Sequence, residues 1–193
     1  MKKGMWIGIG LFAVVWIVLA TLFFPYSFFS VYKSVSVQTE LPILQDYKMK
    51  LYEFKKVDEE NEGWDLLKDK RVDRVKFNTE TILKTFEMDM MTTSRAKISK
   101  RDLNEMFDNV RSLRKTLLYI NFNEELNYES KKYLDAALRW CLAAEDEIVR
   151  LKSSPYYTRF QLIDEIEVIQ NDVRMSFDMY RQFYHAYYWY EGE

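Results

Sequence analysis

Residues 4–24 read GMWIGIGLFAVVWIVLATLFF and contain no charged side chain. A helix rises about 1.5 Å per residue, so this stretch reaches about 31 Å, close to the hydrocarbon thickness of a bilayer. We therefore predict that residues 4–24 form a transmembrane helix after a cytoplasmic stub, residues 1–3. Residues 25–40 are predicted to be an aromatic interfacial segment and linker, and residues 41–193 an extracytoplasmic helical bundle domain.

A cleaved secretory signal is the alternative for this stretch, because it also begins with basic residues and continues into an apolar run. Signal peptides usually have about 7–15 apolar residues followed by small residues at the cleavage site. Here the run is longer and bulky residues follow it, so we predict an uncleaved anchor. Aromatic rings are enriched where proteins cross the membrane interface. The residues expected at that interface are Phe23, Phe24, Tyr26, Phe28, Phe29 and Tyr32.

Basic residues flank the predicted span unequally. Lys2 and Lys3 precede it together with the amino terminus, whereas only Lys33 follows it closely. Cytoplasmic flanks carry the excess of Lys and Arg, so we expect the N-terminus in the cytoplasm and the body outside. Gly4 and Gly8 form a GxxxG pattern, which favours helix pairing in membranes. The pattern lies at the very start of the span, however, and homo-oligomerisation is left open.

Beyond the span, apolar residues recur at spacings of three and four, which indicates amphipathic helices. Such helices are predicted over residues 41–57, 65–91, 99–120, 124–152 and from 155 or 156 onward. No stretch shows sustained alternation of apolar and polar residues, so no strand is predicted. The predicted fold class is all-α, with one N-terminal transmembrane helix followed by an antiparallel bundle of about four to five amphipathic helices.

The charge balance of the body argues against nucleic-acid binding. Of the 28 basic residues, Lys2 and Lys3 precede the span, which leaves 26 against 30 acidic residues and a formal charge of −4. Nucleic-acid affinity comes largely from clustered Lys and Arg, so no nucleic-acid partner is expected. A disulfide scaffold is excluded as well, because Cys141 is the single cysteine and has no partner within the chain.

The residue inventory also argues against catalysis. His185 is the only histidine, so paired ExxH motifs and a HExxH zinc site are excluded. The body has no glycine-rich phosphate loop. Cys141 falls on a predicted buried face, where a thiol behaves as a small hydrophobe. We therefore expect no enzyme activity, no cofactor and no metal. A less favoured role for His185 is pH sensing, because imidazole titrates near neutrality.

The end of the chain is rich in aromatic residues. Aromatic positions 177, 180, 184 and 187 share one helix face and are expected in the core, but their neighbours do not all fit on that face. Exposed Tyr and Trp are typical of binding hot spots. Simple core packing and a return to the membrane interface are the alternatives. The predicted partner-binding residues are Phe183, Tyr187, Tyr188, Trp189 and Tyr190.

Two functions are compatible with these patterns. The first is a non-catalytic interaction or scaffold module, held at the membrane, that binds another membrane or envelope protein. The alternative is a sensory or regulatory subunit whose bundle binds a small ligand and signals through the transmembrane helix to a membrane partner. A body filled solidly along its apolar faces favours the first, whereas an apolar cavity with convergent polar groups favours the second.

Overall fold

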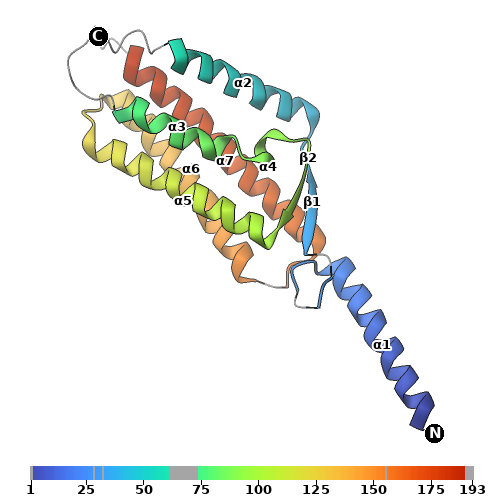
Figure 1. The fold of residues 1–193 in the computed structure, drawn as a ribbon. Coiled ribbons are helices and arrows are strands. Elements are labelled where there is room, and N and C mark those ends of the chain that lie inside the picture. Colours follow the sequence, from blue (N-terminus) through green and yellow to red (C-terminus); the bar gives the residue numbers. More distant parts are fainter. Residues whose placement is uncertain (1, 28, 32, 61–73, 155, 190–193) are drawn as a thin grey trace.

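The computed structural model describes residues 2–27, 29–31, 33–60, 74–154 and 156–189, which are mostly helical (Figure 1). The described residues form seven helices and two strands: α1 Lys2–Phe23, β1 Ser34–Gln38, α2 Leu41–Glu60, α3 Arg74–Phe86, α4 Asp89–Thr92, β2 Arg95–Ser99, α5 Lys100–Asn123, α6 Tyr128–Ser153 and α7 Arg159–Trp189. The prediction of a mostly helical chain with one apolar helix at its N-terminus is confirmed.

Helix α1 projects from the rest of the molecule as a separate rod (Figure 1). Its segment Trp6–Phe23 is long and apolar enough to cross a membrane, by length and composition. The side chains of residues 6–19 are all exposed, so the rest of the protein does not cover them.

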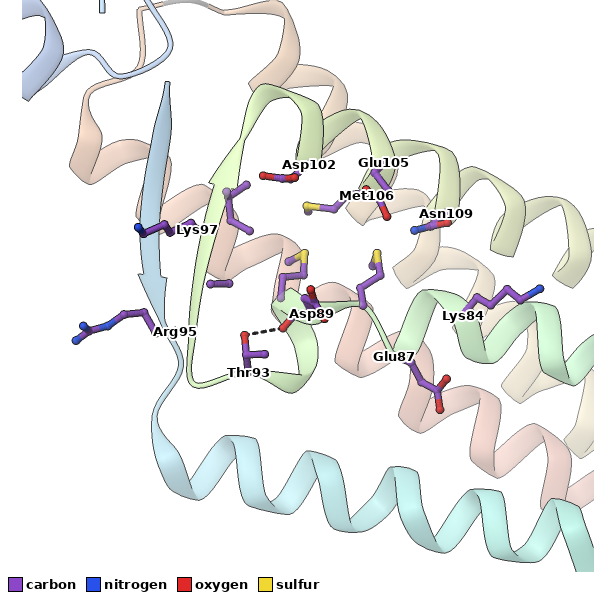
Figure 2. A pocket seen from close by; sticks show the side chains of 14 residues that line it. Lys84, Glu87, Asp89, Thr93, Arg95, Lys97, Asp102, Glu105, Met106 and Asn109 are labelled. Atoms are coloured by element: carbon purple, nitrogen blue, oxygen red, sulfur yellow. Dashed lines mark hydrogen bonds between the residues drawn. The ribbon is translucent and has the colours of Figure 1, made fainter. Parts of the chain in front are cut away.

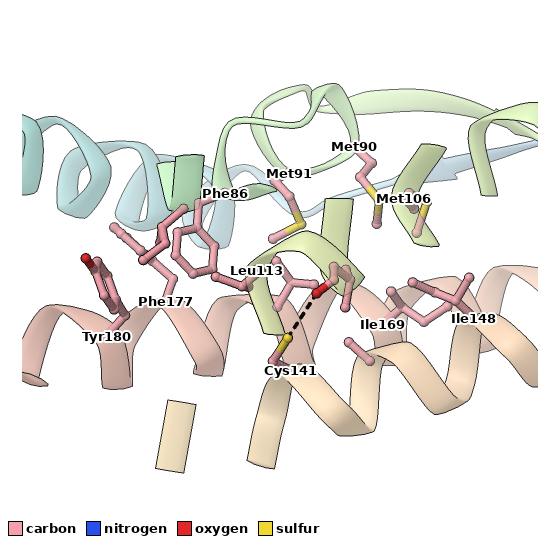
Figure 3. Close-up of a cluster of buried hydrophobic side chains, with 14 of the residues drawn as sticks. Phe86, Met90, Met91, Met106, Leu113, Cys141, Ile148, Ile169, Phe177 and Tyr180 are labelled. Atoms are coloured by element: carbon pink, nitrogen blue, oxygen red, sulfur yellow. Dashed lines mark hydrogen bonds between the residues drawn. The ribbon is translucent and has the colours of Figure 1, made fainter. Parts of the chain in front are cut away.

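The three longest helices, α5, α6 and α7, form the centre of the body. Helix α6 packs against both α5 and α7, and α3 packs against α5. The apolar residues that recur at spacings of three and four in α5 and α6 are buried in this core: Leu103, Met106, Val110, Leu113, Leu117 and Ile120 in α5, and Leu134, Ala137, Cys141, Ala144, Ile148 and Leu151 in α6. Figure 3 shows the interior around Cys141, with Leu113 beside it. Three of the α6 positions are small, which lets the neighbouring backbones approach closely.

Large aromatic side chains fill the space between α2 and α7. The ring of Phe54 lies 5.8 Å from the ring of Phe177, 5.8 Å from that of Tyr180 and 5.0 Å from that of Tyr184, all measured between centroids. Each of these pairs is close to edge-on, the arrangement that aromatic quadrupoles favour. Tyr47 also contributes its hydroxyl, which donates to the Phe86 carbonyl at 2.7 Å. Aromatic packing therefore holds α2 on the body.

Two short strands correct the prediction that the body has none. Strands β1 and β2 pair antiparallel, with Val35 opposite Ile98 and Val37 opposite Ala96. These four side chains are buried. Each strand does alternate apolar and polar residues, but over only five positions, and α2, α3 and α4 lie between the two in the sequence. Part of the segment expected to be a linker, residues 25–40, is thus a strand of this sheet.

Several helix boundaries also differ from expectation. The helix predicted over 65–91 is divided, because α3 ends at Phe86 and α4 follows as a separate short helix, while residues 65–73 lie outside the described residues. Helix α6 begins at Tyr128 because Asn127 is its N-cap and accepts a hydrogen bond from the Ser130 amide at 2.8 Å. Helix α5 begins with a capping box in which Ser99 is the N-cap.

Candidate functional site

The junction between α1 and the body contains the residues predicted to lie at the membrane interface. Phe23, Phe24 and Phe29 are exposed there, whereas Phe28 and Tyr32 lie outside the described residues. Tyr26 does not lie at the exposed position that was expected for it. Its ring is buried in the body, and its hydroxyl donates to the Ile98 carbonyl of β2 at 2.9 Å. Burial raises the pKa of Tyr26 far above its ordinary value, because the phenolate would lose its hydration.

Further hydrogen bonds fix the end of α1 to the body. The Val31 amide donates to the Thr21 hydroxyl at 3.0 Å, and the Arg159 guanidinium donates through Nε to the Leu22 carbonyl at 3.2 Å. The second bond satisfies one of the carbonyls that a helix leaves without a partner at its C-terminus. The last turn of α1 is therefore attached both to the segment before β1 and to the first residue of α7.

The predicted partner-binding residues occupy different environments at the end of α7. Phe183 is fully buried, and the Tyr187 hydroxyl donates to Glu124 Oε2 at 2.9 Å. Tyr188 is half-buried, with its ring centroid 4.6 Å from that of Tyr184. Trp189 is 41% exposed. Tyr190 lies outside the described residues. The structure thus brings together four of the five residues, but three of these four take part in packing within the body.

A surface groove of about 780 Å³ lies between α2 and α7 beside this aromatic cluster. We call it the α2–α7 groove. Its apolar lining comes from both helices: Phe54, Val57, Met175, Met179, Tyr184 and Trp189. Sequence reasoning found only Trp189 of these as a candidate binding residue. The remaining residues come from segments more than 100 positions apart, and neither segment alone predicts that they share a surface.

Charged side chains form the rim of the α2–α7 groove, and they pair with one another. Lys50 Nζ lies 2.9 Å from Asp46 and 3.4 Å from Asp178, and Arg181 lies 3.7 Å from both Asp178 and Glu53. The hydrogen bond to Asp46 is the main reason that the pKa of Lys50 is raised. Because the rim charges compensate each other, the groove offers an apolar floor without a strong field of either sign.

His185 and Cys141 are not paired, which bears on any nucleophilic chemistry. His185 is exposed at the rim of the groove, with its ring 5.3 Å from that of Trp189. Cys141 is buried, and its thiol donates to the Val110 carbonyl at 3.3 Å, as Figure 3 shows. Burial raises the pKa of Cys141 to about 12, so the thiolate is scarce at neutral pH. The arrangement does not activate this thiol.

A second groove, of about 610 Å³, lies among α3, α4, β2 and α5 (Figure 2). Carboxylates from different elements line it, including Glu87, Asp89, Asp102 and Glu105. Asp102 is already engaged, because its Oδ2 accepts from the Ser99 amide at 2.7 Å. Within the described ranges, no group of three or more His, Cys, Asp or Glu side chains is placed to hold a metal ion. The carboxylates of this groove therefore form no metal-binding set among the described residues.

Comparison with known proteins finds no matching family model, no matching curated protein and no matching solved structure.

Proposed function

We propose that this protein is a single-pass membrane protein whose body acts, outside the cytoplasm, as a non-catalytic interaction module for another membrane or envelope protein. The observation that carries the proposal is α1, an apolar helix whose side chains the body leaves uncovered along residues 6–19. Such a surface is unfavourable in water and favourable in hydrocarbon. Its attachment through Tyr26 and Arg159 would hold the body close to the membrane.

The antiparallel bundle belongs to the same proposal. It is supported by the packing of α6 against α5 and α7 and by the short connections, residues 124–127 and 154–158, that join these helices. Short connections between long packed helices favour an up-and-down arrangement. In that arrangement the C-terminal end of α7 lies far from α1, so that the α2–α7 groove would be available to a partner that approaches from outside.

The α2–α7 groove is the binding surface that the geometry supports best. Methionine side chains adapt to irregular ligands, and Trp is enriched at the centres of binding interfaces. Met175, Met179 and Trp189 supply these features on α7, and Phe54 and Val57 face them from α2. An amphipathic helix of the partner, with its apolar side on this floor, is the ligand class that suits a groove with compensated rim charges.

One observation favours the alternative function, a sensory or regulatory subunit. Helix α7 is continuous over 31 residues, from the contact of Arg159 with α1 to Trp189 at the groove. A ligand that shifted α7 would thus have a direct mechanical connection to α1. The interaction module is preferred because the apolar faces of α5 and α6 are filled by buried side chains and both grooves carry charged, exposed rims.

Photo-crosslinking in native membranes tests the proposal. Val57 lies in the groove and Val149 on the outside of α6, and both are exposed valines, which makes them a matched pair for a photoreactive amino acid. We expect position 57, but not position 149, to yield an adduct with one membrane or envelope protein. Trp189→Ala should remove that adduct without unfolding the chain. An adduct with a small molecule at position 57 would support the sensory function, and equal adducts at both positions would contradict a specific groove.

A further inference from the structure

The end of the body nearest α1 carries a group of exposed aromatic side chains. Tyr156 is 80% exposed and Phe160 is 73% exposed, and both lie in or next to the connection between α6 and α7. Phe29, from the segment that follows α1, is exposed as well. Nearby residues are less exposed: Tyr157, which follows Tyr156, packs against the core, and Leu162, two residues after Phe160, is buried. Tyr156 and Phe160 thus have no role in the core.

A hydrogen bond to α1 fixes the position of this connection relative to the end of α1. Arg159 Nε donates to the Leu22 carbonyl at 3.2 Å, and Leu22 belongs to the last turn of α1. Figure 1 shows the start of α7 and the end of α6 on the side of the body where α1 joins it. If α1 spans a bilayer, Tyr156 and Phe160 lie near the level at which α1 leaves the hydrocarbon. Aromatic side chains are favoured at that level.

Basic residues gather at the same end of the body. Ser34 pairs with Ser99 in the sheet, so their neighbours Lys33 and Lys100 lie at the same end of the two strands. Both are exposed. Arg101 follows Lys100 in the first turn of α5, Lys152 lies in the last turn of α6, and Arg159 begins α7 and contacts Leu22 of α1.

Three of the carboxylates near these cations already have partners. Asp102 accepts the Ser99 amide within the capping box, and Glu147 and Glu165 both pair with Arg150. The ion pairs formed among the described residues include none of these five cations, although the body as a whole has a formal charge of −4. A basic end on an acidic body is suited to an anionic surface.

We infer that this end of the body rests on the headgroup layer of the bilayer that holds α1. The proximal surface consists of Phe29, Lys33, Lys100, Arg101, Lys152, Tyr156, Arg159 and Phe160. Tyr156 and Phe160 insert toward the acyl chains, and the cations contact the phosphates of anionic lipids. The inference rests on the proposed function, because α1 must span that bilayer. It adds a second membrane contact, which fixes the tilt of the body and turns the α2–α7 groove away from the lipid.

Fluorescence quenching in vesicles tests this contact with the full-length chain. Tyr156 and Tyr128 are a matched pair, because both are 80% exposed and they lie at opposite ends of α6. Tyr156→Cys, Tyr128→Cys and Val14→Cys are each labelled with an environment-sensitive dye, which buried Cys141 does not accept in the folded protein. The vesicles contain phosphatidylcholine with or without phosphatidylglycerol, and their lipid chains carry a quencher. The quencher lies at shallow depth for the labels at positions 156 and 128. It lies at mid-chain depth for the label at position 14.

We expect the labels at 156 and 14 to be quenched and the label at 128 to stay unquenched, with a difference of at least about twofold between 156 and 128. Phosphatidylglycerol should strengthen the quenching at 156. Lys100→Glu with Arg101→Glu should remove that increase, and acidic residues in the first turn of α5 leave the helix stable.

Other outcomes separate this inference from the proposed function. Quenching at 14 without quenching at 156 would overturn the headgroup contact and leave the membrane anchor intact. An unquenched label at 14 would overturn the anchor itself. Equal quenching at 156 and 128 would also contradict the inference, because the body would then lie on the membrane without a defined end. If the fluorescence of the label at 156 changes only when a membrane protein is added to the vesicles, then that protein and not the lipid contacts this surface.

Discussion

At the scale of single residues, Tyr26 joins the segment that follows α1 to the body. It follows α1 closely in the sequence, yet its ring belongs to the core and its hydroxyl binds the Ile98 carbonyl. Tyr26→Phe keeps the ring and removes only this hydrogen bond. We expect the substitution to lower the free energy of unfolding by about 1 kcal/mol, the typical value for a buried hydrogen bond.

Chemical denaturation of the full-length protein in detergent, followed by near-UV circular dichroism, measures this change. Tyr52→Phe is the control, because Tyr52 is exposed on α2 and its hydroxyl contributes no buried bond. A loss in Tyr26→Phe no larger than in Tyr52→Phe would mean that the hydroxyl of Tyr26 does not hold the junction together.

Cys141 provides a pH-dependent prediction at the same scale. Burial raises the pKa of the thiol from 9.0 to about 12. A group with a raised pKa in the folded protein contributes its full stability below the unfolded pKa and loses it as the pH rises toward the folded value. The free energy of unfolding should therefore fall between pH 9 and pH 12, and less so in Cys141→Ser. At pH 8 a thiol reagent should modify Cys141 only after unfolding, and rapid labelling of the folded protein would contradict its burial.

At the scale of elements, the capping box joins β2 to α5. The Ser99 side chain accepts from the amides of Arg101 and Asp102, and Asp102 accepts from the Ser99 amide. Ser99→Ala removes the cap, and we expect a loss of about 1 kcal/mol of stability. Ser112→Ala is the control, because Ser112 is exposed within the same helix and alanine favours helix there. Comparable thermal unfolding of the two variants would show that the cap contributes nothing.

The elements also show which parts of the fold the sequence can predict. The buried positions of α5 and α6 follow from apolar spacings of three and four within one helix, and the structure buries the residues at these spacings. The pairing of β1 with β2 joins residues separated by more than 50 positions, and each strand is too short for its alternation to stand out. The periodicity within one strand does not indicate which distant segment of the chain pairs with it.

The candidate site was less predictable for a related reason. Aromatic rings suit a lipid interface, a binding surface and a core equally well, so sequence alone did not separate buried Tyr26 and Phe183 from exposed Trp189. The α2–α7 groove depends on two helices that meet only through folding. The basic end near α1 likewise joins cations from distant segments, of which only Lys33 lies close to the span in the sequence.

At the scale of the whole molecule, three surfaces of different chemistry follow one another along one axis. Figure 1 shows α1 at one end and the C-terminal end of α7 toward the opposite end. The basic and aromatic surface lies where the body begins, and the α2–α7 groove lies toward the C-terminal end of α7. We propose that each surface faces the environment that suits its chemistry: hydrocarbon around α1, headgroups at the basic end and a protein partner at the groove.

Alkaline carbonate extraction of membranes from cells that express the full chain tests the central claim most directly, because it removes proteins that only adhere to the membrane surface. We predict that the intact 23.4 kDa chain stays in the membrane pellet. Release of the intact chain into the supernatant, or recovery of a shorter chain that begins after α1, would contradict the account.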